Sequence, residues 1–251
     1  STDRSVELIK DYISKFSDIE IRLIERDVNV GVTRNRDEAI KSMDVDLITT
    51  LDGDDMIFPG KLAAEYEQFD SPEVVVSFSD ILMLNKDAQV HIETKAYNRM
   101  YKQDMLENVC SRKFPVPRDM MFRKSLFIKA MGFDMNMEIY EDWALKMRLI
   151  AFMEEGEYWS HSGTIGTIYD RRNLGLSGRS PVVLAYGQLL ALARNCDYLN
   201  NAALAAGLET VSSLLDGKCK TRLLDVVNSL NQGKESELYR SRLKRIWYER
   251  D

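Results

Sequence analysis

Hydrophobic residues follow two alternating periods along the first eighty residues. In some segments hydrophobic residues recur every three or four positions, as on the inner face of a helix. In others they alternate with polar residues, as in a strand. Near the start, the helical period is carried by Val6, Ile9, Ile13 and Phe16, and the strand period by Ile19, Ile21 and Leu23. Further on we expect a helix over residues 33–43, a strand over 46–51, a helix over 59–69 and a buried strand over 73–78. This alternation predicts an α/β fold with a parallel sheet covered on both faces.

The rest of the chain divides near Ser180. Before this point the pattern predicts a hairpin of residues 81–84 and 89–93, helices over 123–131 and 139–152, and two short strands near 158 and over 164–169. From Pro181 to the end only the helical period recurs. We therefore expect an α/β domain over residues 1–180 and a helical C-terminal region over residues 181–251.

Composition and charge exclude several classes of protein. The 251 residues are 45% hydrophobic, which is enough for a packed core. The net charge of −6 and the pI near 5.2 argue against a protein that coats nucleic acid. No apolar run approaches the roughly 18 residues that span a bilayer. Three cysteines without CxxC spacing indicate neither a disulfide framework nor a zinc site, and the isolated His91 and His161 are expected to be structural.

Three aspartates directly follow the apolar strand expected before them. Asp52, Asp54 and Asp55 stand at its carboxyl end, the edge where open α/β sheets bind ligands. Carboxylates this close repel one another unless a cation neutralises them, and Mg²⁺ is typically held by carboxylates together with substrate phosphates. A calcium loop would need Gly and Glu where Ile57 and Ala63 stand, and no P-loop pattern occurs. A solvated acidic turn is the alternative, but the position after a strand favours a metal site.

Several motifs, in order, resemble the family 2 glycosyltransferases of the GT-A fold. Residues 51–55 (LDGDD) are similar to the family's DxD motif, and residues 29–35 (NVGVTRN) to the NxGxxxARN-like segment upstream of it. Later matches are a DDxxxP…L pattern over 54–62, Ser79-Asp80, Gly132-Phe133-Asp134, an EDxxLxxRL pattern over 141–149 and a closing loop over 169–177. The resemblance implies a GT-A fold with a mostly parallel sheet flanked by helices. The family's first strand and helix would precede Ser1, and we expect this chain to lack them.

The resemblance also implies a reaction and the residues that carry it. The reaction is sugar transfer with inversion from a nucleotide sugar, expected to be a UDP-sugar, to a hydroxyl acceptor such as a growing glycan or lipid-linked glycan in polysaccharide biosynthesis. Asp54, Asp52 and Asp55 are the expected ligands of a Mn²⁺ or Mg²⁺ ion that stabilises charge on the leaving diphosphate. Asp52 is also a candidate for contact with the ribose. Asp142, with Glu141 beside it, is the expected general base that takes the acceptor's proton.

Two further segments are expected to bind the donor. Arg34 and Asn35 are candidates near the first motif, and Arg34 is equally suited to the diphosphate or to bracing the sheet. Arg171, Arg172 and Ser177 belong to a polar loop that we expect to close over the diphosphate. The histidine often found in the family's loop is replaced here by arginine or asparagine. We therefore expect arginine to neutralise charge in place of a third metal ligand.

Two other functions stay open from the sequence. A nucleotidyltransferase of similar architecture would also use aspartates and a cation, and a degenerate relative would bind a ligand without catalysis. We expect a cytoplasmic protein without nucleic-acid partners, and the sequence predicts no oligomeric state. A basic C-terminal helix either packs on its own domain, which we favour, or makes a peripheral contact with the inner face of the membrane. Its apolar stripe consists of Tyr239, Leu243, Ile246 and Trp247.

Overall fold

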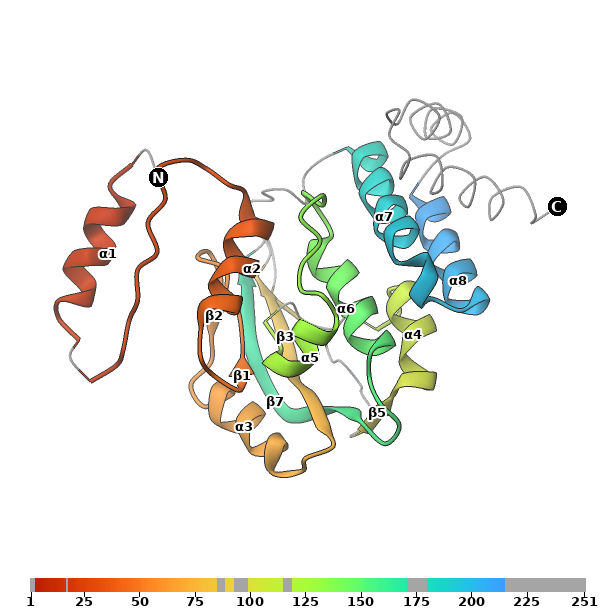
Figure 1. Cartoon of the computed structure of the whole chain (residues 1–251), viewed down its shortest axis with the longest axis horizontal. Coiled ribbons are helices and arrows are strands. Elements are labelled where there is room, and N and C mark those ends of the chain that lie inside the picture. Colours follow the sequence, from red (N-terminus) through yellow and green to blue (C-terminus); the bar gives the residue numbers. More distant parts are fainter. Residues whose placement is uncertain are drawn as a thin grey trace.

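A mixed β-sheet forms the centre of the protein, with helices packed against it (Figure 1). The computed structural model describes residues 3–16, 18–84, 89–92, 99–114, 119–170 and 180–214. Within these residues the sheet has seven strands. β4 (Gln89–Ile92) pairs with β3, and β5 (Arg99–Tyr101) pairs with β7. The other strands lie in the order β1 (Leu47–Ile48), β6 (Met121–Arg123), β3 (Val74–Leu84), β7 (Tyr158–Asp170) and β2 (Met56–Ile57).

The strand directions bring three carboxyl ends to the same edge of the sheet. β3 and β7 are parallel, whereas β6 is antiparallel to both of its neighbours, β1 and β3. β1, β3 and β7 therefore run in one direction. The sheet is mixed because β6 and the strands β2, β4 and β5 pair antiparallel with their neighbours. The expected α/β fold is confirmed, but the sheet is mixed rather than mostly parallel as expected, because short antiparallel strands pair beside β1, β3 and β7. The shared direction of these three strands marks the edge where such sheets bind ligands.

Successive side chains of β3 and β7 face two different helical layers, as the period of two in a strand requires. Ser79 and Ser160 face α3 (Lys61–Glu67) and the 3-10 turn η1 (Gln68–Asp70), where they donate hydrogen bonds to Glu65 and Gln68. Their neighbours Phe78 and Trp159 are fully buried, with ring centroids 6.5 Å apart. The same apolar core takes in side chains of α4 (Lys102–Cys110), α5 (Lys124–Lys129) and α6 (Glu141–Ala151).

The helical region predicted after residue 180 is present over residues 181–214, the part of it that the structure describes. It comprises α7 (Pro181–Asn195), the 3-10 turn η3 (Cys196–Tyr198) and α8 (Asn201–Ser213). α7 begins with proline at its first position, and the Asn200 side chain caps α8 by accepting from Ala203 N–H at 2.8 Å. α7 packs on α6 and α8 packs on α4, so these helices share the main core. The division at Ser180 stays a prediction, and the apolar stripe over residues 239–247 lies outside the described residues.

The segment between α1 (Ser5–Ile13) and α2 (Val32–Ser42) departs from the sequence prediction. Residues 19–23, predicted as a strand, form none, and the side chains of Ile19 and Ile21 are exposed. α1 is helical as predicted, but none of its residues is buried, and it stands beside the rest of the described chain (Figure 1). A strand is stable only where a neighbour completes its hydrogen bonds, and no described strand pairs with residues 19–23. Apolar alternation was therefore an insufficient signal here.

Two other predictions in the middle of the chain concern β3 and β7. The predicted hairpin is confirmed, because Ile81 pairs with Ile92 and Leu84 with Gln89 across β3 and β4. The two strands predicted near 158 and over 164–169 form one strand, β7, whose register against β3 shifts along its length. No helix within the described ranges is long and apolar enough to cross a bilayer.

Candidate active site

Three carboxylates converge at the turn that follows β1. Oxygen atoms of Asp52, Asp54 and Asp55 all lie within 4.8 Å of one another. The turn is closed by Asp55 N–H, which donates to Asp52 O at 3.1 Å. Asp170 N–H at the end of β7 donates to the Asp55 carboxylate at 3.2 Å. Asp55 is therefore buried against the sheet, whereas Asp54 is exposed. The acidic turn is thereby fastened to the carboxyl ends of two parallel strands.

The spacing of these oxygens fits a hard divalent cation. Mg²⁺ binds oxygen at about 2.0–2.1 Å and Ca²⁺ at about 2.3–2.6 Å, so two ligands of one ion are separated by no more than about 5 Å. The three aspartates meet this limit, and they offer only carboxylate oxygens, which such ions prefer. Asp52, Asp54 and Asp55 were the ligands expected from the sequence, and the structure brings them together.

Arg36 joins this turn to the second acidic motif. Its guanidinium forms an ion pair with Asp52 Oδ1, and its Nη1 donates to Glu141 Oε1 at 3.3 Å. The side chains of Arg36, Asp52 and Glu141 are only 18%, 19% and 12% exposed. Arg36 and Glu141 are 105 positions apart in the sequence. The DxD-like turn and the acidic pair at the start of α6 therefore belong to one site.

The two residues of the acidic pair have different surroundings. Burial raises the pKa of Glu141, and the negative charge of Asp142 raises it further, while Arg36 opposes both effects. The side chain of Asp142 is 30% exposed and accepts from Lys146 Nζ at 3.1 Å, one helical turn later. Both residues lie in the first turn of α6, where the helix dipole favours a negative charge. Asp142 is thus the more accessible carboxylate of the pair.

The residues expected near the first motif are placed differently from their neighbour Arg36. Arg34 pairs with Glu38 one turn along α2 and is 60% exposed, and the Asn35 side chain accepts from Arg26 Nε at 2.9 Å. Arg36, rather than Arg34, is the arginine of α2 that braces the fold, by joining Asp52 to Glu141. Helical spacing contained the signal, because position 36 lies three residues after Thr33 and four before Ile40, the buried side of α2. Both Arg34 and Asn35 remain candidates for donor contact.

The loop residues Arg171, Arg172 and Ser177 lie outside the described residues. Their expected contact with the diphosphate therefore stays a prediction. The described chain ends on one side of this loop at Asp170, whose backbone binds Asp55, and resumes at Ser180 before α7. Asp170, the last described residue before this segment, thus lies directly beside the acidic turn.

A buried polar network that the sequence analysis missed holds the end of β7. Lys61 Nζ donates to Glu65 Oε2 and to Asp119 O, both at 2.8 Å. The Asp119 carboxylate accepts from Thr167 Oγ1 and from Tyr169 Oη. Burial raises the pKa of Glu65 to about 7. Because Tyr169 immediately precedes Asp170, this network supports the strand end that holds Asp55.

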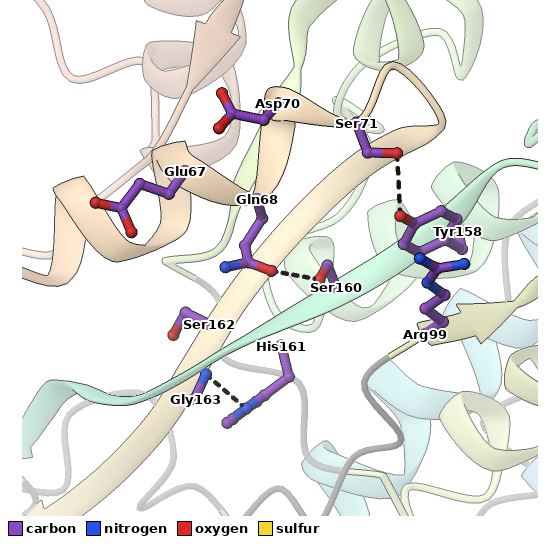
Figure 2. A pocket seen from close by; sticks show the side chains of 10 residues that line it. All are labelled: Glu67, Gln68, Asp70, Ser71, Arg99, Tyr158, Ser160, His161, Ser162 and Gly163. Atoms are coloured by element: carbon purple, nitrogen blue, oxygen red, sulfur yellow. Dashed lines mark hydrogen bonds between the residues drawn. The ribbon is translucent and has the colours of Figure 1, made fainter.

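A separate hollow lies at the other end of β7, between that strand and η1 (Figure 2). Its volume is about 500 Å³. Side chains along its wall bind one another: Ser160 donates to Gln68 at 2.7 Å, and Tyr158 donates to Ser71 at 3.1 Å. Ser160 and Tyr158 begin β7, whereas the acidic turn meets the end of that strand. This hollow is therefore distinct from the acidic site, and its polar groups serve to hold η1 on the sheet.

His161, which also lines the hollow, contacts both its own strand and the neighbouring one. Gly163 N–H donates to His161 Nδ1 at 3.0 Å (Figure 2). His161 Nε2 lies 3.0 Å from Asp80 Oδ1 on the neighbouring strand. The ring also packs edge-on against Phe78 at 5.3 Å. These contacts tie β7 to β3.

Comparisons with known proteins agree with this architecture. In structure, the chain is similar to S. aureus TarS 1–349, with a TM-score of 0.68 at 14% identity over 98% of this chain and 71% of that one. The same TarS segment in complex with UDP-GlcNAc gives a TM-score of 0.69 at 14% identity over 98% and 79% of the two chains. A longer TarS structure gives 0.65 at 15% identity over 100% and 46%. At this identity, the likeness shows a shared GT-A glycosyltransferase fold.

Sequence comparison gives the family. No curated protein matches the chain. The model of glycosyl transferase family 2 matches residues 1–130, which include the acidic turn and Arg36 and make up more than half of the chain. This match favours glycosyl transfer over the nucleotidyl transfer that the sequence left open. The chain therefore belongs to glycosyl transferase family 2.

Proposed function

We propose that this chain transfers a sugar, with inversion, from a UDP-sugar to a hydroxyl of a glycan or lipid-linked glycan. The observation that supports the proposal is the double contact of Arg36, which joins Asp52 of the acidic turn to Glu141 of the acidic pair. A donor diphosphate at the turn and an acceptor hydroxyl at the pair would then be neighbours. Inversion by direct displacement requires this arrangement.

Asp52, Asp54 and Asp55 are the proposed ligands of a Mn²⁺ or Mg²⁺ ion. When bound, the ion supplies positive charge against the diphosphate that leaves the sugar. The chain's own contribution is to keep the three carboxylates in place. Asp170 N–H holds Asp55, and Arg36 holds Asp52, while Asp54 stays exposed to incoming ligand. Arg34, Asn35, Arg171, Arg172 and Ser177 are proposed as further donor contacts.

Asp142 is the proposed general base. It takes the proton of the acceptor hydroxyl as the oxygen attacks the anomeric carbon, and its greater exposure makes it the accessible carboxylate of the pair. Lys146 Nζ lies 3.1 Å from its carboxylate, which stands in the first turn of α6, where the helix dipole favours negative charge. Glu141 is buried against Arg36 and orients the pair.

The choice of UDP-sugar is supported by the fold neighbours. TarS 1–349 has been solved with UDP-GlcNAc and with UDP, and the two structures have TM-scores of 0.69 and 0.59 to this chain. The overall fold shared with these complexes supports the same class of nucleotide for this chain. The choice of a glycan hydroxyl as acceptor comes from the family resemblance.

Binding and transfer assays on two variants test the proposal. Calorimetry with UDP and Mn²⁺ should show binding to the wild-type chain and none to Asp54→Ala. Sugar transfer from a panel of sugar nucleotides should be abolished in Asp142→Asn. Asp104→Asn is the matched control, because Asp104 is an exposed aspartate in the first turn of another helix, α4, and this variant should keep full activity.

Each outcome has a separate meaning. Unchanged UDP binding in Asp54→Ala would refute the metal site. Transfer that survives Asp142→Asn would refute the general base. Absence of any UDP binding by the wild-type chain would favour the non-catalytic relative that the sequence left open.

A further inference from the structure

The residue directly before the acidic pair has an unusual backbone conformation. Tyr140 is left-handed, with φ 62° and ψ 20°, and it is the N-cap of α6. A residue other than glycine rarely adopts this conformation, and it does so where the surrounding structure imposes it. The direction in which Glu141 and Asp142 leave the loop therefore depends on whatever holds Tyr140.

Helix α7 holds Tyr140 from one side. Gln188 Nε2 donates to Tyr140 Oη at 3.0 Å, and the Gln188 side chain is 2% exposed. Gly187 lets the helix approach closely: a Cβ at this position would lie 2.5 Å from Ile139 Cδ1 and 3.0 Å from Tyr140 Cδ2. Real Cβ atoms do not come this close to other atoms, so a larger residue at position 187 must displace the side chain of Ile139 and press on the ring of Tyr140.

Residues of α4 and α6 hold the ring of Tyr140 from other sides. The guanidinium of Arg112, just after α4, lies 5.2 Å from the ring centroid. The Trp143 ring meets it edge-on at 6.0 Å, and Trp143 is in turn fixed by donating from Nε1 to Val109 O at 2.8 Å. Tyr140 is therefore held at the junction of three helices. Its conformation depends on α7 in particular through a hydrogen bond and a close backbone approach.

We infer that Gly187 and Gln188 act through Tyr140 as positioning residues for Glu141 and Asp142. The inference rests on the proposed function, in which Asp142 takes the acceptor's proton. If α7 is pushed away or the hydrogen bond is lost, Tyr140 relaxes and the first turn of α6 moves relative to the acidic turn. A misplacement of about 1 Å at a reacting group costs up to about 100-fold in rate. The donor's ligands on the β1 turn touch this junction only through Arg36, which pairs with Asp52 and Glu141.

Gly207 in α8 provides a matched control for Gly187. It is also a buried helix glycine, and a Cβ there would lie 2.6 Å from Leu192 Cδ2. Its neighbour Leu192 belongs to α7 and has no part in the loop before α6. Gly187→Ala and Gly207→Ala thus add the same atom to equally crowded sites. They differ in whether that atom displaces Tyr140.

Steady-state kinetics and hydrogen exchange on the full chain test the inference. Gly187→Ala should lower kcat by about 10-fold to 100-fold while the KM for donor changes less than about twofold. It should also speed amide exchange over residues 139–143. Gly207→Ala should change neither kcat nor exchange in that segment, although both variants lower the melting temperature. Equal effects of the two variants, or a slowdown caused entirely by KM, would overturn the inference.

A second pair of variants decides the question if Gly187→Ala does not fold. Tyr140→Phe and Gln188→Leu each remove one partner of the hydrogen bond, and each should lower kcat and speed exchange over 139–143. The double variant should be no worse than the poorer single variant, because both changes break the same contact. Additive effects, or unchanged exchange in the single variants, would overturn the inference. Failure of the proposed function shows separately, as transfer that survives Asp142→Asn, while the exchange result still decides the positioning role.

Discussion

Replacing Arg36 tests whether the acidic turn and the acidic pair form one electrostatic unit. Arg36→Gln removes the positive charge between Asp52 and Glu141 but keeps a side chain of similar shape. Breaking a fully buried ion pair costs about 3–5 kcal/mol, and breaking an exposed one costs about 0–1 kcal/mol. All three side chains are less than one fifth exposed, so we expect a cost in unfolding free energy of about 2 kcal/mol, between these limits.

This cost is measurable as a shift in melting temperature. For a chain of this size, 1 kcal/mol corresponds to about 2–4 °C, so Arg36→Gln should melt about 4–8 °C below wild type. Arg34→Gln is the control two residues away. Arg34 is 60% exposed and forms a pair with Glu38 one turn along the helix, which is worth about 0.3–0.5 kcal/mol, or about 2 °C at most.

Melting in the presence of Mn²⁺ tests whether this electrostatic unit is connected to the metal site. If a divalent ion binds Asp52, Asp54 and Asp55, it replaces part of the charge that Arg36 supplied. Added Mn²⁺ should then raise the melting temperature of Arg36→Gln by more than that of Arg34→Gln. Equal melting temperatures for the two variants without metal would refute the electrostatic unit. An equal response of the two variants to Mn²⁺ would refute its connection to the metal site.

Three further predictions concern the supporting structure. Burial raises the pKa of Glu65 to about 7, so the folded protein keeps a proton that the unfolded chain releases between about pH 4.5 and 7. The free energy of unfolding should therefore fall as pH rises through this window in urea melts, and Glu65→Gln should remove that dependence. Burial also raises the pKa of the Cys110 thiol to about 12. Peptide mapping of the native protein should therefore find Cys110 unmodified by iodoacetamide under conditions that modify the partly exposed Cys196. Gly132→Ala should lower the unfolding free energy by about 2 kcal/mol or more, because φ is 70° there and the new Cβ would lie 2.3 Å from Asp37 Oδ1. Gly156→Ala is the control: φ is 87° at this position, but the new Cβ would meet open space, so the variant should lose less unfolding free energy in the same melts.

The parts of the site that are local in sequence could be predicted. An apolar run followed by Asp52, Asp54 and Asp55 indicates a strand that ends at a ligand-binding edge, and β1 does precede this turn. The helix that begins with Glu141 was likewise visible in its apolar period. Their mutual contact was not derivable from either pattern. It came from the order of family motifs, and the structure supplies its physical basis in Arg36.

Elements whose stability depends on a distant neighbour were predicted less well. Residues 19–23 alternate like a strand, yet no described strand completes their hydrogen bonds. β6 is three residues long and gave no sequence signal, although it lies between β1 and β3 and makes the sheet mixed. In each case the backbone's hydrogen-bonding partner, which the local sequence does not reveal, decides the outcome.

Tyr140 shows the same dependence at a single residue. Local propensity assigns left-handed backbone to glycine or asparagine, so no sequence rule would place a tyrosine there. The conformation is stable because Gln188, Gly187 and Arg112, all remote in sequence, surround the side chain. The acidic residues can thus be recognised from the local sequence, but the orientation of their side chains depends on helices before and after them in the chain. For this reason we expect substitutions in α7, outside every motif of the family, to change catalysis more than substitutions in exposed motif residues such as Arg34.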